Sequence, residues 1–277
     1  MIPVGILTAA ATSSFSFLLD QYPGAAAAYS LRKLRSAYTG AAIRITSTGI
    51  GSPSTDIGFV NNVLDVTTLQ TFVGANTAVV TTWYDQSGNG NNATNISNIP
   101  KIIISGVLQT QNSLPCIKFT NEWLDFITPI GAVNTNISIF MTAKGDSIAT
   151  PGPILGAQGA PTVFFGYFAN TFSDIALGGG LNGTYNFVTT TPVYRNTNFL
   201  IYNAIVNSTN YYLYQNNNTF TNSISAAGLS PTSFNSIGRY FNYQSYAKFS
   251  EIVIYKSDQT ANRTGIINNT NSFYTIF

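Results

Sequence analysis

The sequence predicts an all-β fold, an antiparallel β-sandwich with a short helix near each end of the chain. From residue 79 onward, apolar and β-branched segments of about four to ten residues alternate with Gly, Pro, Asn or Ser, a rhythm typical of sandwiches and barrels. Hydrophobic residues make up 44% of the 277 positions, which is enough for the sizeable core of one large domain. No repeat and no linker interrupts the pattern.

The N-terminal region is expected to hold an arm and then a helix. Residues 1–22 read as an extended arm, and 23–277 as one domain. Pro23 suits the first position of a helix, and the apolar spacing within 25–38 predicts that helix. The residues with this three- and four-residue spacing are Leu31, Leu34 and Tyr38.

The remaining elements follow from local patterns. A helical turn is predicted over 67–72 and a C-terminal helix over 260–274, with Ser257 or Asp258 as its N-cap. Asn-rich turns at 207–210 and 216–218 predict two hairpins. Strands are predicted at 42–45, 56–60, 79–84, 101–108, 115–119, 124–127, 136–143, 153–156, 162–168, 174–178, 184–189, 198–206, 210–215, 234–239 and 247–256.

The loop Trp83–Asn92 is the most specific motif in the chain. It reads Trp-Tyr-Asp-Gln-Ser-Gly-Asn-Gly-Asn-Asn after a β-branched strand. Asp and Ser in such a loop bond nearby amides, and Gly permits positive φ. Asp85, Asn89 and Asn91 are therefore predicted to form a structural turn. A weak calcium site is the alternative, because these side chains offer oxygen ligands; no other cofactor is expected.

Three segments of the chain carry a family resemblance: 29–59, the loop 83–92, and the strand Phe249–Tyr255 followed by Ser-Asp-Gln. The first two resemble the start of the catalytic domain of fungal α-L-arabinofuranosidase B. The last two are similar to laminin-G/concanavalin-like domains of phage and giant-virus structural proteins. The resemblance implies a concanavalin/laminin-G-like jelly roll and spans about the first 125 and last 45 residues, a guide to fold more than to activity.

Charge is scarce, since only 8% of the residues are charged and the net charge is +2. The basic residues look scattered along the sequence, so no stripe for nucleic acid is expected. Only the run 32–35, with Arg32, Lys33 and Arg35, clusters; we interpret it as the solvated face of the first helix. The N-terminal segment has no signal or membrane-spanning pattern.

Catalytic residues are hard to find in the sequence. The chain has no histidine, which excludes His-based triads, and its single cysteine, Cys116, is expected to be a buried thiol. A retaining glycosidase needs two carboxylates about 5 Å apart. Glu122, Asp146 and Asp174 are the acids that a hydrolase would be tested on, but none matches a catalytic motif, so no catalytic residue is assigned and no enzyme is expected.

Aromatic clusters suggest binding of sugars. The segment 239–246 reads as an exposed loop, and its Arg239, Tyr240, Tyr243 and Tyr246 are the predicted glycan-binding residues. The tyrosines of 211–214 alternate along a strand, which favours simple packing on one sheet face.

The expected function is that of a non-catalytic virion protein at a capsid vertex, spike or fibre. Its expected partners are other virion proteins, further copies of the chain and a host surface glycan, without nucleic acid or a membrane span, and its expected location is the extracellular particle. The first alternative is a glycan-binding module of a cell-surface or secreted protein. The second is an arabinofuranosidase-like glycoside hydrolase.

Overall fold

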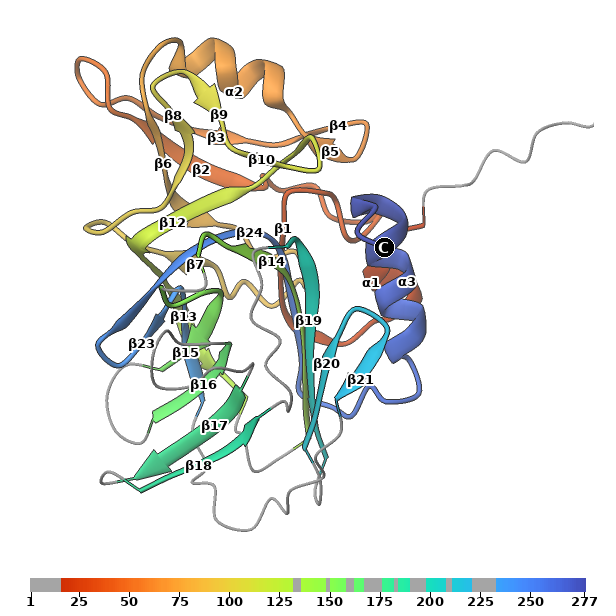
Figure 1. Cartoon of the computed structure of the whole chain (residues 1–277). Coiled ribbons are helices and arrows are strands. Elements are labelled where there is room, and N and C mark those ends of the chain that lie inside the picture. The colour runs from red at the N-terminus through yellow and green to blue at the C-terminus, as the bar shows by residue number, and fades with distance from the viewer. Residues whose placement is uncertain are drawn as a thin grey trace, which may run out of the picture.

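The computed structural model describes residues 16–131, 136–147, 150–157, 162–166, 176–181, 184–189, 198–207, 211–220 and 233–277. Strands dominate these residues, and nearly all pair in one continuous, mostly antiparallel system (Figure 1). Helices are confined to α1 (Leu18–Gln21), α2 (Val66–Val73) and α3 (Arg263–Tyr274) within the described part. None of them is both long and apolar enough to cross a bilayer.

One sheet is organised around the long strand β24 (Tyr243–Tyr255). β14 (Ile137–Gly145) pairs with one edge of it, and β1 (Ala25–Ser30) and β12 (Ile117–Glu122) pair with the other. The sheet continues beyond β14 through β19 (Leu200–Val206), β20 (Tyr211–Gln215) and β21 (Asn218–Phe220).

A second run of strands faces this sheet and extends above it (Figure 1). Its upper part holds β2 (Ile43–Ser47), β3 (Ser54–Ile57), β6 (Ala78–Trp83), β8 (Lys101–Ile104) and β9 (Val107–Leu108), with the hairpins β4 (Phe59–Val60)–β5 (Val63–Leu64) and β10 (Thr110–Gln111)–β11 (Leu114–Pro115). Its lower part holds β7 (Ala93–Thr94), β13 (Leu124–Ile130), β22 (Phe234–Ile237), β15 (Ile154–Gly156), β16 (Thr162–Gly166), β17 (Ala176–Leu181) and β18 (Thr184–Thr189). The short β23 (Arg239–Tyr240) forms a hairpin with the start of β24.

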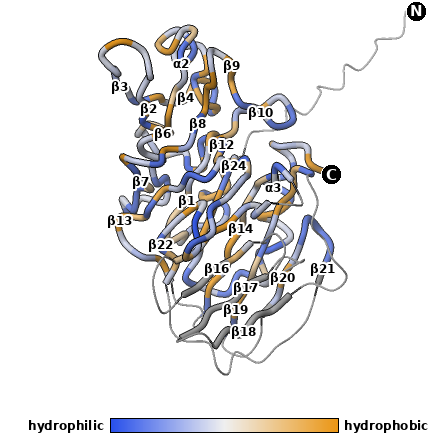
Figure 2. The backbone as a smooth tube through the Cα atoms, turned by 60° about the vertical axis from the view of Figure 1, so that its left-hand side comes forward, coloured by the Kyte–Doolittle hydropathy of each residue, from blue (hydrophilic) through white to orange (hydrophobic). Residues whose placement is uncertain are grey.

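Two cores explain why the central strands are buried on both faces. Alternate residues of a strand point to opposite sides. Met141 of β14 and Ile252 of β24 face the main core between the sheets. Phe140 and Val253 face a second core, which α1 and α3 cover from outside. The resulting hydrophobic stretch along β14 stands out in Figure 2.

Much of the predicted architecture is confirmed. The β-sandwich, the C-terminal helix and most strands lie within a few residues of their predicted bounds. α2 begins where Asp65 accepts a hydrogen bond from the Thr68 amide at 3.0 Å. β19–β20 and β20–β21 pair as hairpins, although 208–210 in the first turn lie outside the described residues.

The helix predicted over 25–38 is wrong. Ala25–Ser30 is strand β1, in which Ala28 lies opposite Val253 and Tyr29 opposite Ile252. These alanines are buried, so burial and pairing with β24 outweigh their helix propensity. The short N-terminal helix is α1, within the predicted arm, and residues 1–15 of that arm lie outside the described residues.

Candidate functional site

The loop after β6 is organised by Asp85, which is buried. One carboxylate oxygen accepts hydrogen bonds from the amides of Ala28 and Ser87, both at 2.8 Å. The other accepts from the Ser87 hydroxyl at 2.7 Å and from the Asn91 amide at 3.0 Å. Both oxygens therefore already face hydrogen-bond donors from the protein itself.

The neighbouring amide side chains fasten this loop to two strands. Gln86 bridges the carbonyls of Ser30 and Arg32 at 2.9 and 3.0 Å. Asn89 donates to the Ala25 carbonyl, and Asn91 exchanges two hydrogen bonds with the backbone of Thr128. The loop joins the beginning of the chain to β13, and within the described residues no cluster of three metal-binding side chains occurs.

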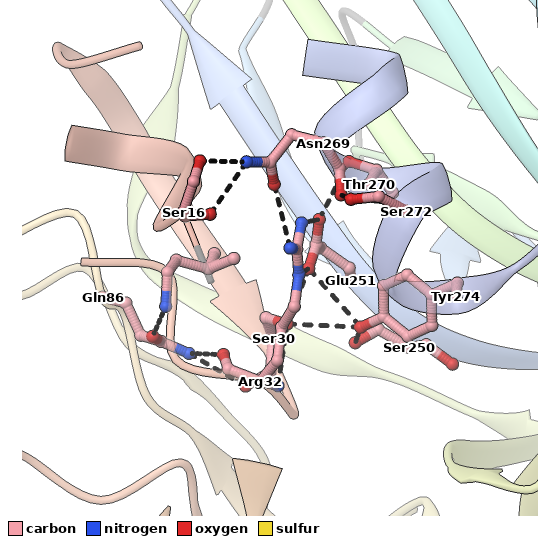
Figure 3. Close-up of polar contacts among 11 residues, drawn as sticks. Ser16, Ser30, Arg32, Gln86, Ser250, Glu251, Asn269, Thr270, Ser272 and Tyr274 are labelled. Atoms are coloured by element: carbon pink, nitrogen blue, oxygen red, sulfur yellow. Dashed lines mark hydrogen bonds and ion pairs between the residues drawn. The ribbon is translucent and has the colours of Figure 1, made fainter. Parts of the chain in front are cut away.

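The basic run 32–35 is not the solvated helix face that its sequence suggests. Arg32 is buried, and its guanidinium forms a two-pronged pair with the equally buried Glu251 of β24, with N–O distances of 2.7 and 2.9 Å (Figure 3). Burial lowers the pKa of Arg32, but Glu251 and Tyr274 together raise it more, so the guanidinium stays charged. Sequence reasoning missed this pair, because its partners are separated by most of the chain.

Helix α3 completes the shell around this ion pair. Asn269 accepts from Arg32 at 2.9 Å, and the Thr270 hydroxyl lies 3.3 Å from Glu251. Ser30 donates to Glu251 at 2.8 Å, while the Phe273 ring lies 5.1 Å from the guanidinium carbon. Buried charges paired and hydrogen-bonded in this way fix how the helix sits on the sheet.

The predicted glycan-binding segment forms a hairpin, and Arg239 is its most connected residue. Its guanidinium lies 4.3 Å from the centre of the Trp123 ring and donates to Asp125 at 2.8 Å. The Trp123 indole N–H donates to the other oxygen of Asp125 at 3.1 Å. Burial lowers the pKa of Arg239, and Asp125 opposes that shift. These three side chains, which we call the arginine site, leave the Asp125 carboxylate 44% exposed.

The two tyrosines of the hairpin lie directly opposite each other on β23 and β24. The rings of Tyr240 and Tyr243 stack with centres 6.5 Å apart. Tyr240 is buried against β15. The two strands approach closely there, since a Cβ atom at Gly156 would lie only 2.6 Å from the Arg239 carbonyl oxygen. Tyr243 remains 40% exposed. Because alternate residues face opposite ways, this stack and Arg239 project from opposite sides of the hairpin.

The fourth predicted residue, Tyr246, lies further along β24, opposite Thr120 of β12. It lies two residues beyond Gln244, the residue opposite Arg239, and so just outside the hairpin on the same face of β24. In the other aromatic cluster, Tyr212 stacks on Tyr214 with ring centres 6.3 Å apart, and Tyr214 is buried.

The lysines are not scattered in space. Strand pairing places Lys118 opposite both Lys101 and Lys248, and Lys248 opposite Lys144. The prediction that the chain lacks a basic stripe is wrong for this reason. The row of lysines cannot be recognised in the sequence, because its members are far apart along the chain. Only the pairing of strands β8, β12, β24 and β14 makes them neighbours.

The acids offer little to a hydrolase mechanism within the described residues. Glu122 is ion-paired with Lys101, and Asp146 lies 3.8 Å from Lys118. Every other described carboxylate also accepts a hydrogen bond from a side chain or backbone amide, and Asp174 lies outside the described residues. Cys116 is buried, and burial raises the pKa of its thiol to about 12.

A separate open pocket of about 730 Å³ lies between the segment after β1 and the β4–β5 turn. Lys33, Tyr38, Phe59, Asn61 and Asn62 contribute to its walls. None of the residues predicted to bind a glycan or a metal lines it.

Comparison with solved structures shows the fold. A GH54 α-L-arabinofuranosidase soaked with a cyclic sulfate inhibitor aligns with a TM-score of 0.68 at 15% identity over 88% of this chain. An arabinofuranosidase complexed with arabinofuranosyl-α-1,2-xylobiose aligns with a TM-score of 0.67 at 16% identity over the same share. The chain spans 62% of the length of these enzymes. No family model and no curated protein matches the sequence.

These matches correct the expected function. Both of these structures are glycoside hydrolases, which contradicts the expected virion role at a capsid vertex, spike or fibre. The expected relationship is supported at the level of the β-sandwich fold, whereas the expected likeness to viral structural proteins has no support among these structures.

Proposed function

We propose that this chain is a carbohydrate-binding protein and that the arginine site, Trp123, Asp125 and Arg239, contacts the sugar. The observation that carries the proposal is the half-exposed Asp125 carboxylate, fixed on one side by Arg239 and on the other by the Trp123 indole. Saccharide recognition needs a few fixed polar groups beside an apolar surface. The arginine site supplies both.

Each group has a chemical role toward a sugar. Asp125 accepts hydrogen bonds from hydroxyls, since it remains exposed after binding its two protein donors. Arg239 is largely buried, and its charge-assisted hydrogen bond holds the Asp125 carboxylate in the orientation that faces the ligand. The Trp123 ring offers apolar surface to the C–H face of a sugar. Stacking on Trp123 also limits the rotation of the guanidinium, so less entropy is lost when a ligand binds.

A glycan array of neutral and acidic saccharides tests the proposal, followed by calorimetric titration with the best oligosaccharide. Arg239→Met and Asp125→Asn are expected to weaken binding at least about tenfold, because each removes a charge-assisted contact. Tyr212→Ala is the matched control: it removes a half-exposed tyrosine from β20, a strand that carries none of the arginine-site residues. Thermal unfolding of all variants checks that they fold.

An array that stays blank at high protein concentration contradicts the proposal. So does an affinity that Arg239→Met and Asp125→Asn leave unchanged while both variants remain folded.

Hydrolysis is the second candidate, supported by the arabinofuranosidase-like architecture together with the exposed Asp125. Incubation with arabinosides and assay of released sugar tests it. Turnover that Asp125→Asn abolishes while the binding affinity is kept supports an enzyme. Binding without any release of sugar supports a binding module.

A further inference from the structure

Four lysines form a row across four adjacent strands: Lys101 on β8, Lys118 on β12, Lys248 on β24 and Lys144 on β14. Directly opposed residues of antiparallel strands project from the same face. With strands about 4.8 Å apart, the row is about 14 Å long. All four residues are partly exposed, so the row is open to solvent.

The row is only partly neutralised. Glu122 pairs with Lys101, and Asp146 lies 3.8 Å from Lys118. Lys248 donates to the Thr110 carbonyl at 3.3 Å, and Lys144 has no ion pair or hydrogen bond among the described residues. Four cations against two carboxylates leave an excess of positive charge on this face.

Folding alone does not account for this arrangement. Like charges directly opposite each other destabilise a sheet. The sequence holds six lysines in all, at positions 33, 101, 118, 144, 248 and 256. A chain with so little charge nevertheless aligns four of them, which points to an anionic ligand that offsets the repulsion.

The rest of the face indicates the class of anion. Tyr246, half-buried, lies opposite Thr120, two residues along the same strands from the Lys248–Lys118 pair. An aromatic ring and a hydroxyl beside the cations suit a sugar that carries carboxylates. The two carboxylates Glu122 and Asp146 leave the four lysines a net charge of only +2 (4 − 2), too little to neutralise the dense phosphates of a nucleic-acid backbone.

We propose that the row formed by Lys101, Lys118, Lys144 and Lys248, with Tyr246 beside it, binds a linear polysaccharide bearing carboxylates. This inference rests on the proposed function, which it extends to an acidic polymer, but it uses none of the residues of the arginine site. The two can therefore fail separately.

Gel retardation in matrices containing polygalacturonate tests the inference, with neutral dextran and a single-stranded oligonucleotide as comparison probes. The double variant Lys118→Thr, Lys248→Thr is expected to lose at least about tenfold in affinity for polygalacturonate, and salt is expected to weaken wild-type binding. The matched control Lys33→Thr, Lys256→Thr has the same change in net charge outside the row, and is expected to keep wild-type affinity. Arg239→Met is expected to leave this binding intact.

Three results would overturn the inference: no retardation of the wild type by polygalacturonate, equal losses in the two double variants, or tighter binding to the oligonucleotide than to polygalacturonate. If the row double variant fails to fold, Lys144→Thr takes its place, with Lys256→Thr as the control. Lys144 has no hydrogen-bond or ion-pair partner within the described part of the chain that the substitution would leave unpaired. Unchanged affinity in a folded Lys144→Thr variant counts against the row.

Discussion

The Arg32–Glu251 cluster and the lysine row use charge in opposite ways. In the cluster, a buried guanidinium and a buried carboxylate satisfy each other, and groups from β1 and α3 complete the shell (Figure 3). In the row, like charges face each other across strands and remain partly exposed. Complete pairing of charges in the Arg32–Glu251 cluster stabilises the fold. Incomplete pairing in the lysine row leaves positive charge that an anionic ligand can neutralise.

We expect the largest loss of stability when one partner of the buried Arg32–Glu251 pair is removed. Arg32→Met leaves Glu251 charged and unpaired in the interior, and we expect the free energy of unfolding to fall by about 3–5 kcal/mol. Denaturant unfolding measures it. The double variant Arg32→Met, Glu251→Met is expected to lose less, because it removes both charges; a double variant that is as unstable as the sum of the singles contradicts this role of the pair.

The Asp85 loop comes next. Asp85→Asn replaces an acceptor of four hydrogen bonds with an amide that cannot accept at both of its polar atoms. We expect a loss of about 2–3 kcal/mol in the free energy of unfolding, because buried donors lose their partner. Calcium is expected to leave the melting temperature of the wild type unchanged; a calcium-dependent rise that Asp85→Asn abolishes would instead indicate a metal site.

Cys116 tests whether the interior of the folded protein is closed to reagents, because its thiol is buried. Burial raises the pKa of its thiol to about 12, and the thiolate is the reactive form. At mildly alkaline pH a thiol reagent is expected to label the native protein at least about tenfold more slowly than the unfolded chain. Equal rates would show that the thiol is accessible in the folded protein.

The smallest change in stability is expected from substitutions in the lysine row. Lys144→Thr removes a cation opposite Lys248 and breaks no ion pair with any residue that the structure describes, so we expect the free energy of unfolding to rise by about 0.2–1 kcal/mol. Lys256→Thr is the control on an exposed position. A clear loss of stability in Lys144→Thr alone would show that the row supports the fold.

The sequence predicted the strand rhythm well, because alternation and turn residues act locally. It failed at 25–38, where apolar spacing indicated a helix while the alanines were needed as a buried strand beside β24. The candidate sites were predicted only in part. Arg239 was found, but its partners Trp123 and Asp125 lie more than a hundred residues away. The lysine row and the Arg32–Glu251 pair depend entirely on long-range register.

Fluorescence of the two tryptophans tests the proposed function most directly, since Trp123 lies in the arginine site while Trp83 is fully buried in the core. Titration of the wild type with the oligosaccharide selected on the array is expected to give a saturable change in emission. The change is expected to disappear in Trp123→Phe, whose fold is checked by thermal unfolding. No change at saturating ligand, or the same change in folded Trp123→Phe, would contradict sugar binding at this site.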